Sequence, residues 1–136
     1  MTTELPTDRL YTDDHEWVLL QSGTDLPTEP VRVGITALAV ENLGDLVYLD
    51  LPEVDAEVTV GEACGEVEST KTVSDLFSPV GGRVAAVNDA VIADPALVST
   101  DPYGEGWLFT VLATSAGDLL TAAEYADAAE LNGNPS

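Results

Sequence analysis

The only lysine of the chain, Lys71, lies in the segment VESTKTVSD at residues 67–75. Its amine is the first group to consider for covalent chemistry. The chain has 25 acidic residues against 4 lysines and arginines, and no other position holds a lysine. A Schiff-base lysine needs burial or a nearby positive charge to become a free amine. Here Glu68 and Asp75 favour the charged ammonium form instead. Lys71 is therefore an ordinary solvated side chain or a displayed site of attachment by another enzyme, and its uniqueness favours attachment.

Other catalytic patterns are missing from the sequence. It contains no GxGxxG or Walker-type phosphate loop, and one cysteine, Cys64, excludes both an internal disulfide and a CxxC pair. A serine–lysine SxxK motif would need serine at position 68, where glutamate stands. The only histidine, His15, lies in the acidic stretch DDHEW at residues 13–17. We interpret this stretch as the start of an edge strand with Trp17 buried, rather than a metal site, and Cys64 as a small near-core side chain.

The charge balance narrows the range of partners. A net charge of −21 argues against nucleic acids and anionic membrane surfaces, which attract basic proteins. The first residues lack the features of a signal or transit peptide, and no apolar run is long enough to span a bilayer. A single cysteine suits a reducing compartment. We expect a cytoplasmic protein whose partners are neutral or locally basic.

Short apolar segments with a period of two dominate the chain, and Gly, Pro, Asn or Asp residues separate them. This pattern predicts a mostly β fold, an antiparallel sandwich or barrel, with Lys71 at a hairpin tip spanning 68–75. The length predicts one domain at 10–131, with loose segments at 1–9 and 132–136. The alternating apolar sets are Val31, Val33 and Ile35; Val47, Leu49 and Leu51; Ala56, Val58 and Val60; and Trp107, Phe109 and Val111; over 62–69, Glu62, Glu66 and Glu68 alternate with Ala63, Gly65, Val67 and Ser69.

Three short helices are indicated by their boundary residues. Thr36 is a predicted N-cap for a helix that ends at Gly44. Asp94 and Pro95 predict the start of a single helical turn. Near the end, Thr121 and Glu124 match a capping box before an alanine-rich helix that runs to about residue 131.

Taken together, several of these stretches resemble the H-protein family of the glycine cleavage system, whose members are lipoyl carriers. Any one block is weak, but the blocks follow the family order and spacing over about residues 10–112. The resemblance implies an antiparallel β-sandwich, a barrel-sandwich hybrid of the lipoyl-domain type, with a few short helices and a C-terminal helix. The matching blocks are YT at 11–12, HEWV at 15–18, VGIT at 33–36, LGDLVY at 43–48, LP at 51–52, GE at 61–62, GEVESTK at 65–71, SDL at 74–76, SPV at 78–80, DPYG at 101–104 and GWL at 106–108.

The resemblance also implies a function. (R)-lipoate would be amide-linked to Lys71 by a lipoyl-attaching enzyme. The arm would take an aminomethyl group from a glycine decarboxylase (P protein) and pass it to an aminomethyltransferase (T protein). Dihydrolipoamide dehydrogenase (L protein) would then reoxidise it. The chain would be a carrier rather than an enzyme. The implied roles are hairpin recognition for Glu68 and Asp75, and docking of the loaded arm for Asp14 and Glu16. For Glu16, an ordinary solvated carboxylate is an equal alternative.

Related carriers differ at the tip of the hairpin. Lipoyl domains of 2-oxoacid dehydrogenase acyltransferases usually have Asp-Lys-Ala there, and biotin carriers flank the lysine with methionines. In this chain Thr70 and Thr72 flank Lys71, and the only methionine is Met1. The sequence leaves open a stand-alone lipoyl relay to 2-oxoacid dehydrogenase complexes.

Overall fold

Nine strands and four helices lie within the residues that the structure, a computed structural model, describes, namely 5–20 and 26–128. Every strand pair is antiparallel within the two sheets. In chain order the elements are β1 (Leu10–Tyr11), β2 (Glu16–Val18), β3 (Val31–Ile35), α1 (Ala37–Leu43), β4 (Leu46–Asp50), β5 (Glu57–Val58), β6 (Ala63–Ser69), β7 (Val73–Phe77), β8 (Val80–Val87), α2 (Asp89–Ala93), α3 (Ala96–Thr100), β9 (Phe109–Ala116) and α4 (Ala122–Ala128).

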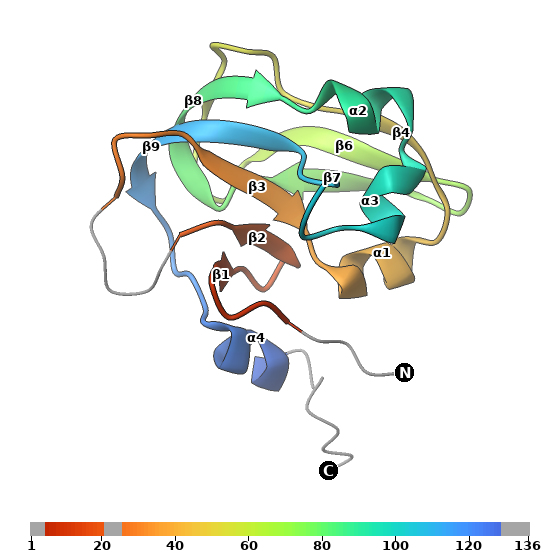
Figure 1. Cartoon of the computed structure of the whole chain (residues 1–136), viewed down its shortest axis with the longest axis horizontal. Coiled ribbons are helices and arrows are strands. Elements are labelled where there is room, and N and C mark those ends of the chain that lie inside the picture. Colours follow the sequence, from red (N-terminus) through yellow and green to blue (C-terminus); the bar gives the residue numbers. More distant parts are fainter. Residues whose placement is uncertain (1–4, 21–25, 129–136) are drawn as a thin grey trace.

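The strands form a six-stranded sheet in the order β1-β2-β3-β9-β8-β5 and a three-stranded sheet in the order β4-β6-β7 (Figure 1). One buried apolar cluster draws residues from both sheets, including Val33 and Phe109 from the larger and Leu49, Val67 and Leu76 from the smaller. This shared core confirms the predicted antiparallel, mostly β architecture.

The predicted alternation is confirmed in the strands that carry the hairpin. In β6, Glu66 and Glu68 are exposed while Val67 and Ser69 are buried. A strand turns successive side chains to opposite faces, so the acidic residues point outward and the valine enters the core. Strand β6 therefore turns apolar side chains to the core and its glutamates to solvent.

In β4 the predicted apolar face is wrong. Leu46 and Leu49 are buried there, whereas Val47 is 49% exposed and Tyr48 is 56% exposed. The cause is a register shift between Leu46 and Tyr48 in the pairing of β4 with β6. A bulge of this kind inserts an extra residue and breaks the alternation of two, so that consecutive side chains can face solvent.

The predicted first helix is confirmed as α1. Thr36 caps it, since the Thr36 hydroxyl accepts a hydrogen bond of 3.2 Å from the N–H of Ala39. Gly44 ends it with a φ of 87° and donates its N–H to the carbonyl of Val40. This backbone conformation is one that glycine adopts without strain.

The second predicted helical turn is confirmed as α3, but its cap differs from the one that the sequence predicts. Asp94 ends a helix, α2, that the sequence analysis did not predict, and its N–H donates to the carbonyl of Ala90. Asn88 caps α2 through its side-chain oxygen. The next helix, α3, follows Pro95 and has no side-chain cap. Asp94 therefore closes one helix instead of capping the other.

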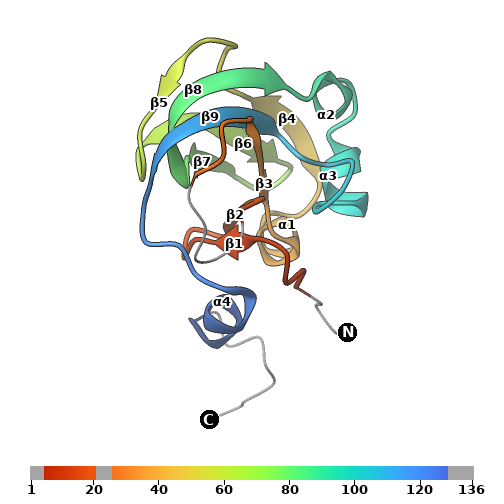
Figure 2. The ribbon, with the colours of Figure 1, turned by 60° about the vertical axis from the view of Figure 1, so that its left-hand side comes forward.

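The C-terminal helix α4 lies beside β1, away from β5 and β8 (Figures 1 and 2). Its predicted capping box is confirmed, because Thr121 and Glu124 each donate a backbone N–H to the other's side chain, at 2.9 and 3.2 Å. The expected end of this helix near residue 131 and the predicted loose tail at 132–136 lie outside the described residues. Within 5–20 and 26–128, no helix combines the length and apolar character needed to cross a bilayer.

Candidate functional site

Lys71 lies where the sequence predicts it, in the turn at residues 70–72 that joins β6 to β7, lime green at the right of Figure 1. Its side chain is exposed. The strands on either side pair through Glu66 with Asp75 and through Glu68 with Val73, so the hairpin has regular antiparallel geometry up to the turn. The amine is therefore displayed on a short turn at the end of an ordered ribbon.

The hydroxyl of Ser69 stabilises this turn through hydrogen bonds to its backbone. It accepts hydrogen bonds from the backbone N–H groups of Lys71 and Thr72, both at 3.1 Å, and donates to the carbonyl of Thr72. Ser69 is buried, and its own N–H also donates to the carbonyl of Thr72 at 2.8 Å. Sequence reasoning assigned no role to this residue, although a serine just before a turn is a recognised signal for such side-chain to backbone bonds.

A second support comes from the connection between α1 and β4. The N–H of Thr70 donates to the carbonyl of Asp45 at 3.0 Å. Beside it, Gly44 lies under the lysine stem, since a Cβ at Gly44 would fall 2.9 Å from Cε of Lys71. The tip of the hairpin is thus attached to the C-terminal end of α1.

The predicted recognition residues, Glu68 and Asp75, are both exposed on the outer face of the three-stranded sheet. They lie on neighbouring strands and occupy adjacent cross-strand positions rather than one pair. Neither lies in the pocket described below.

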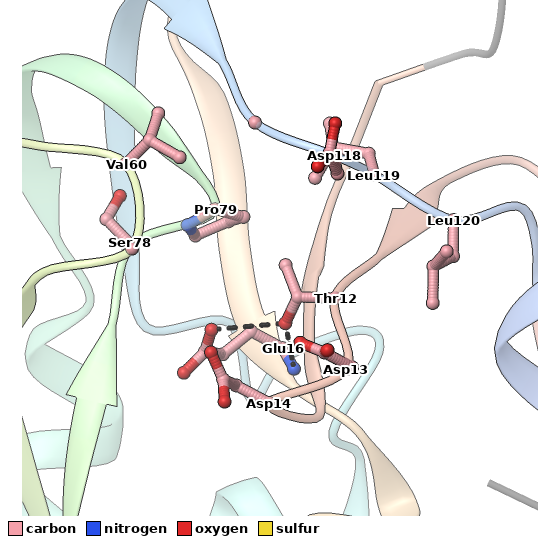
Figure 3. Close-up of a pocket in the computed structure, with 12 residues that line it drawn as sticks. Thr12, Asp13, Asp14, Glu16, Val60, Ser78, Pro79, Asp118, Leu119 and Leu120 are labelled. Carbon is pink, nitrogen blue, oxygen red and sulfur yellow. Dashed lines mark hydrogen bonds between the residues drawn. The ribbon is translucent and has the colours of Figure 1, made fainter. Parts of the chain in front are cut away.

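Asp14 and Glu16, the predicted docking residues, both line one pocket of about 290 Å³ (Figure 3). Four segments form its walls, and backbone hydrogen bonds join them, including Gly61 N–H to the Ser78 carbonyl. Two carboxylates of the turn before β2, Asp13 and Asp14, line this pocket together with Glu16 of β2 and Asp118. The lining residues are Thr12, Asp13, Asp14, Glu16, Val60, Gly61, Ser78, Pro79, Gly117, Asp118, Leu119 and Leu120.

Glu16 is buried, with 2% of its surface exposed, so the solvated alternative does not hold. One carboxylate oxygen accepts a hydrogen bond of 2.9 Å from the N–H of Phe77, and the other accepts one from the hydroxyl of Thr12. Burial is the main cause that raises the pKa of the Glu16 carboxyl to about 8; the hydrogen bond from Phe77 lowers the pKa, and the nearby charge of Asp14 raises it. Burial thus favours the neutral form of this carboxyl over the charged form.

The turn before β2 corrects one further expectation. Strand β2 pairs with β1 on one side and β3 on the other, so it is an interior strand, although Trp17 is buried as predicted. His15 has a φ of 69°, in the left-handed region that histidine enters more readily than most residues. The chain reverses there and directs Asp14 and Glu16 to the pocket.

A buried tyrosine on α4 holds this turn in place, and no local sequence pattern predicts the contact. The hydroxyl of Tyr125 lies 2.7 Å from Nδ1 of His15 and 2.9 Å from the hydroxyl of Thr36. The Tyr125 ring stacks on Tyr11 with centroids 5.1 Å apart. The turn that carries the acidic residues is therefore joined to the N-cap of α1, whose other end supports the lysine hairpin.

The remaining candidate groups have structural positions. Cys64 is partly buried, and burial raises the pKa of its thiol to about 12, so the reactive thiolate is disfavoured. Among the described residues, no group of three or more His, Cys, Asp or Glu side chains has an arrangement that could hold a metal ion.

Known proteins match this chain over the residues described above. A family model described as glycine cleavage H-protein matches residues 9–132. The glycine cleavage system H protein of Corynebacterium jeikeium (strain K411) is 54% identical over 128 residues, which span 94% of this chain and 99% of that protein. The H protein of Beutenbergia cavernae is 56% identical over 122 residues, covering 90% of this chain and 94% of that protein.

A solved structure agrees at the level of the fold. The crystal structure of a glycine cleavage system H protein from Mycobacterium marinum matches with a TM-score of 0.92 and 57% sequence identity. The match covers 93% of this chain and all of that one, 100%. The similarity confirms the predicted fold class, the sandwich of the lipoyl-domain type.

Proposed function

The chain belongs to the glycine cleavage H-protein family, and from that premise we propose that Lys71 carries a covalently attached lipoyl group. Its role is that of the H protein of the glycine cleavage system. The observation that carries the proposal is the position of the only lysine, exposed on a turn that Ser69 and Asp45 hold in place. A modifying enzyme can reach such an amine, and no second lysine competes with it.

The group fits this position. An amide to Nζ removes a positive charge and requires no burial, so an exposed and firmly held turn is well suited to bear it. When attached, the lipoyl group supplies a dithiolane that takes up the aminomethyl group of glycine and releases it to the next enzyme. The chain itself has one cysteine and no dithiol of its own. We therefore describe the protein as a carrier, not a catalyst.

In this account, Glu16 and Asp14 hold the end of the loaded arm in the pocket. An aminomethyl amine is cationic, and a carboxylate binds such an amine through a charge-assisted hydrogen bond. The buried Glu16 carboxyl ionises more readily when a cation sits beside it. Its bonds from Phe77 and Thr12 orient both oxygens before the amine arrives.

The hairpin supplies the geometry that the docking requires. Phe77, at the far end of β7 from the turn, donates to Glu16. A strand rises about 3.3 Å per residue, so Lys71 and Phe77 are separated by roughly 20 Å of chain. The arm would fold back along β7 to reach the pocket. Glu16 of β2 is thus joined by a hydrogen bond to the end of β7 opposite the turn that carries Lys71.

Glu68 and Asp75 are the proposed recognition marks for enzymes that approach the hairpin. Both are exposed beside Lys71, and a carboxylate at such a position attracts a cationic partner surface. The partners we propose are the lipoyl-attaching enzyme, glycine decarboxylase, aminomethyltransferase and dihydrolipoamide dehydrogenase. We place their meeting point in the cytoplasm. No observation favours the alternative of a relay to 2-oxoacid dehydrogenase complexes.

Intact-mass analysis tests the attachment. The protein is incubated with lipoate, its lipoyl-attaching enzyme and the required nucleotide, and Lys71→Arg serves as the matched control because it keeps the charge. One lipoyl increment on the wild-type chain and none on the variant is the expected result. An unmodified wild-type chain, or an equal increment on the variant, would contradict the proposal.

A further inference from the structure

The bulge in β4 turns two consecutive apolar side chains to solvent beside the lysine hairpin. Val47 is 49% exposed and Tyr48 is 56% exposed. Tyr48 lies opposite Glu68 on β6, and Glu68 lies opposite Val73 on β7, which is 53% exposed. Val47, Tyr48 and Val73, called the apolar patch here, are thus exposed beside the lysine hairpin, and the carboxylate of Glu68 lies between Tyr48 and Val73.

The next row on the same face is acidic. Asp50 lies opposite Glu66, and Glu66 lies opposite Asp75, so three carboxylates follow one another across three strands. Like charges at directly opposed positions disfavour the sheet. In the described part of the chain, the arginine–carboxylate salt bridges involve Asp8 and Asp55 and none of these three residues. The outer face therefore combines an apolar patch with a row of carboxylates that lacks a cationic partner within those residues.

We propose that this outer face is the docking surface for the enzyme that acylates Lys71, and that this enzyme presents cationic side chains around an apolar recess that accepts Tyr48. The inference rests on the proposed function and adds the surface and the chemistry of the partner to it. Exposed aromatic side chains beside a polar rim are typical of the residues that dominate the binding energy of protein interfaces.

The reaction itself selects this occupant among the proposed partners. An enzyme that acylates Nζ must bring its reactive carbon within bonding distance of the turn, so its surface must cover the face that adjoins the turn. An enzyme that acts on the far end of the attached arm can bind at a distance from the turn, because the arm spans that distance. It has no comparable need to contact Val47 or Tyr48.

The chemical balance of the step is simple. The enzyme supplies an activated acyl group, such as an acyl–phosphate anhydride or a thioester. The ammonium of Lys71 loses one proton, and Nζ attacks the acyl carbon to form the amide C–N bond. The bond from the acyl carbon to its leaving group breaks, the leaving group departs with the electron pair, and the nitrogen loses a second proton.

Steady-state lipoylation kinetics with varied carrier concentration test the patch. Val47→Ser and Tyr48→Ser are compared with Val54→Ser, which is matched because Val54 is also 49% exposed but lies in the β4–β5 turn. That turn is bonded to β8 of the other sheet through Asp55. We expect Tyr48→Ser to raise KM by about fivefold or more with little change in kcat, since lost interface contacts weaken binding. Val54→Ser should match the wild type.

Variants that remove negative charges test the row of carboxylates formed by Asp50, Glu66 and Asp75. The double variant Asp50→Asn with Asp75→Asn should lower kcat/KM and flatten its dependence on salt, since attraction between exposed charges is screened. Glu53→Gln, an exposed carboxylate in the same turn as Val54, is the control and should leave the salt dependence unchanged.

The two proposals fail in different ways. A wild-type chain that is never lipoylated overturns the attachment site itself. A wild-type chain that is lipoylated, with KM values for Val47→Ser and Tyr48→Ser within a factor of about two of it, overturns the docking surface alone. Normal lipoylation of both variants with impaired glycine-dependent exchange by the decarboxylase assigns the face to that enzyme and also overturns the inference. Circular dichroism of each variant confirms that folding is intact.

Discussion

The buried carboxylate of Glu16 accepts a hydrogen bond of 2.9 Å from the backbone N–H of Phe77, 61 positions later in the chain. This contact joins the acidic pocket to the base of the strand that presents Lys71. A displacement of the hairpin would change the surroundings of Glu16. The pocket and the hairpin that carries Lys71 are therefore in direct contact through β7.

The first prediction concerns the pH dependence of stability. The pKa of Glu16 is raised from 4.5 to about 8, so the folded state holds this proton more tightly than the unfolded state does. Its favourable contribution is fully present below pH 4.5 and is lost as the pH rises to about 8. Glu16→Gln cannot ionise and should remove this loss. Urea unfolding at pH 5 and pH 8.5 should show a smaller decline for the variant.

The comparison is made as a difference between the two proteins, because the many other acidic residues titrate equally in both. An identical decline in the free energy of unfolding for Glu16→Gln and the wild type would mean that Glu16 is not protonated in the folded chain. Glu124 is unsuitable as a control position because its side chain accepts a hydrogen bond in the cap of α4. Glu105→Gln, an exposed carboxylate, is the appropriate one.

The second prediction concerns the turn around Lys71. Ser69→Ala removes the hydroxyl that accepts from Lys71 and Thr72, and it should cost about 1 kcal/mol in the free energy of unfolding. Hydrogen exchange of those two amides should become markedly faster. Ser74→Ala, on the same hairpin, removes only a weak bond of 3.5 Å and should change neither quantity. Unchanged exchange in Ser69→Ala would show that the strands alone define the turn.

The third prediction separates backbone strain from contact with the lysine. Gly44 and Gly61 have φ values of 87° and 77°, so alanine at either position should cost on the order of 1–3 kcal/mol in stability. Only Gly44 lies against the Lys71 side chain, whereas a Cβ at Gly61 meets nothing within 4 Å. We expect Gly44→Ala, but not Gly61→Ala, to change the rate of lipoylation measured by intact mass. Equal rates of lipoylation in both variants would show that the contact between Gly44 and Lys71 does not affect the reaction.

The fourth prediction concerns Tyr125. Tyr125→Phe keeps the ring stacked on Tyr11 but removes the hydroxyl that bridges His15 and Thr36. Loss of the two hydrogen bonds to His15 and Thr36 makes the expected cost about 1–3 kcal/mol in the free energy of unfolding. Nuclear magnetic resonance should also show shifted signals for His15 and Glu16. Tyr48→Phe is the stability control, since Tyr48 is exposed, and it should stay within about 0.5 kcal/mol of the wild type. A Tyr125→Phe variant as stable as that control would contradict the bridging role.

The sequence allowed prediction where local rules decide the structure. Alternation in β6 predicted that Val67 is buried, and cap residues predicted both α1 and the start of α4. The bulge in β4 could not be predicted in this way, because the alternation of inward and outward side chains assumes that the strand register is unbroken. Helix α2 was missed because five residues carry too little periodic pattern.

In the candidate site, too, features set by local sequence could be predicted and features set by long-range contacts could not. Lys71 could be located from its uniqueness and its turn, and Asp14 and Glu16 from the family resemblance. The burial of Glu16 depends on Phe77 and on walls from distant segments, so no local pattern signals it. The bridge from His15 through Tyr125 to Thr36 joins three segments and is equally invisible to spacing. Long-range contacts of this kind set the electrostatics of the pocket.

Glycine-dependent exchange of carbon dioxide, catalysed by glycine decarboxylase, tests directly whether Lys71 bears the working arm. The assay compares the wild-type chain and Lys71→Arg, each treated in the same way with lipoate and the attaching enzyme. We expect exchange with the wild-type chain and only background exchange with Lys71→Arg, because the arginine variant keeps the charge but lacks the amine that is acylated. Exchange at the wild-type rate with Lys71→Arg would contradict the claim that this lysine bears the working arm.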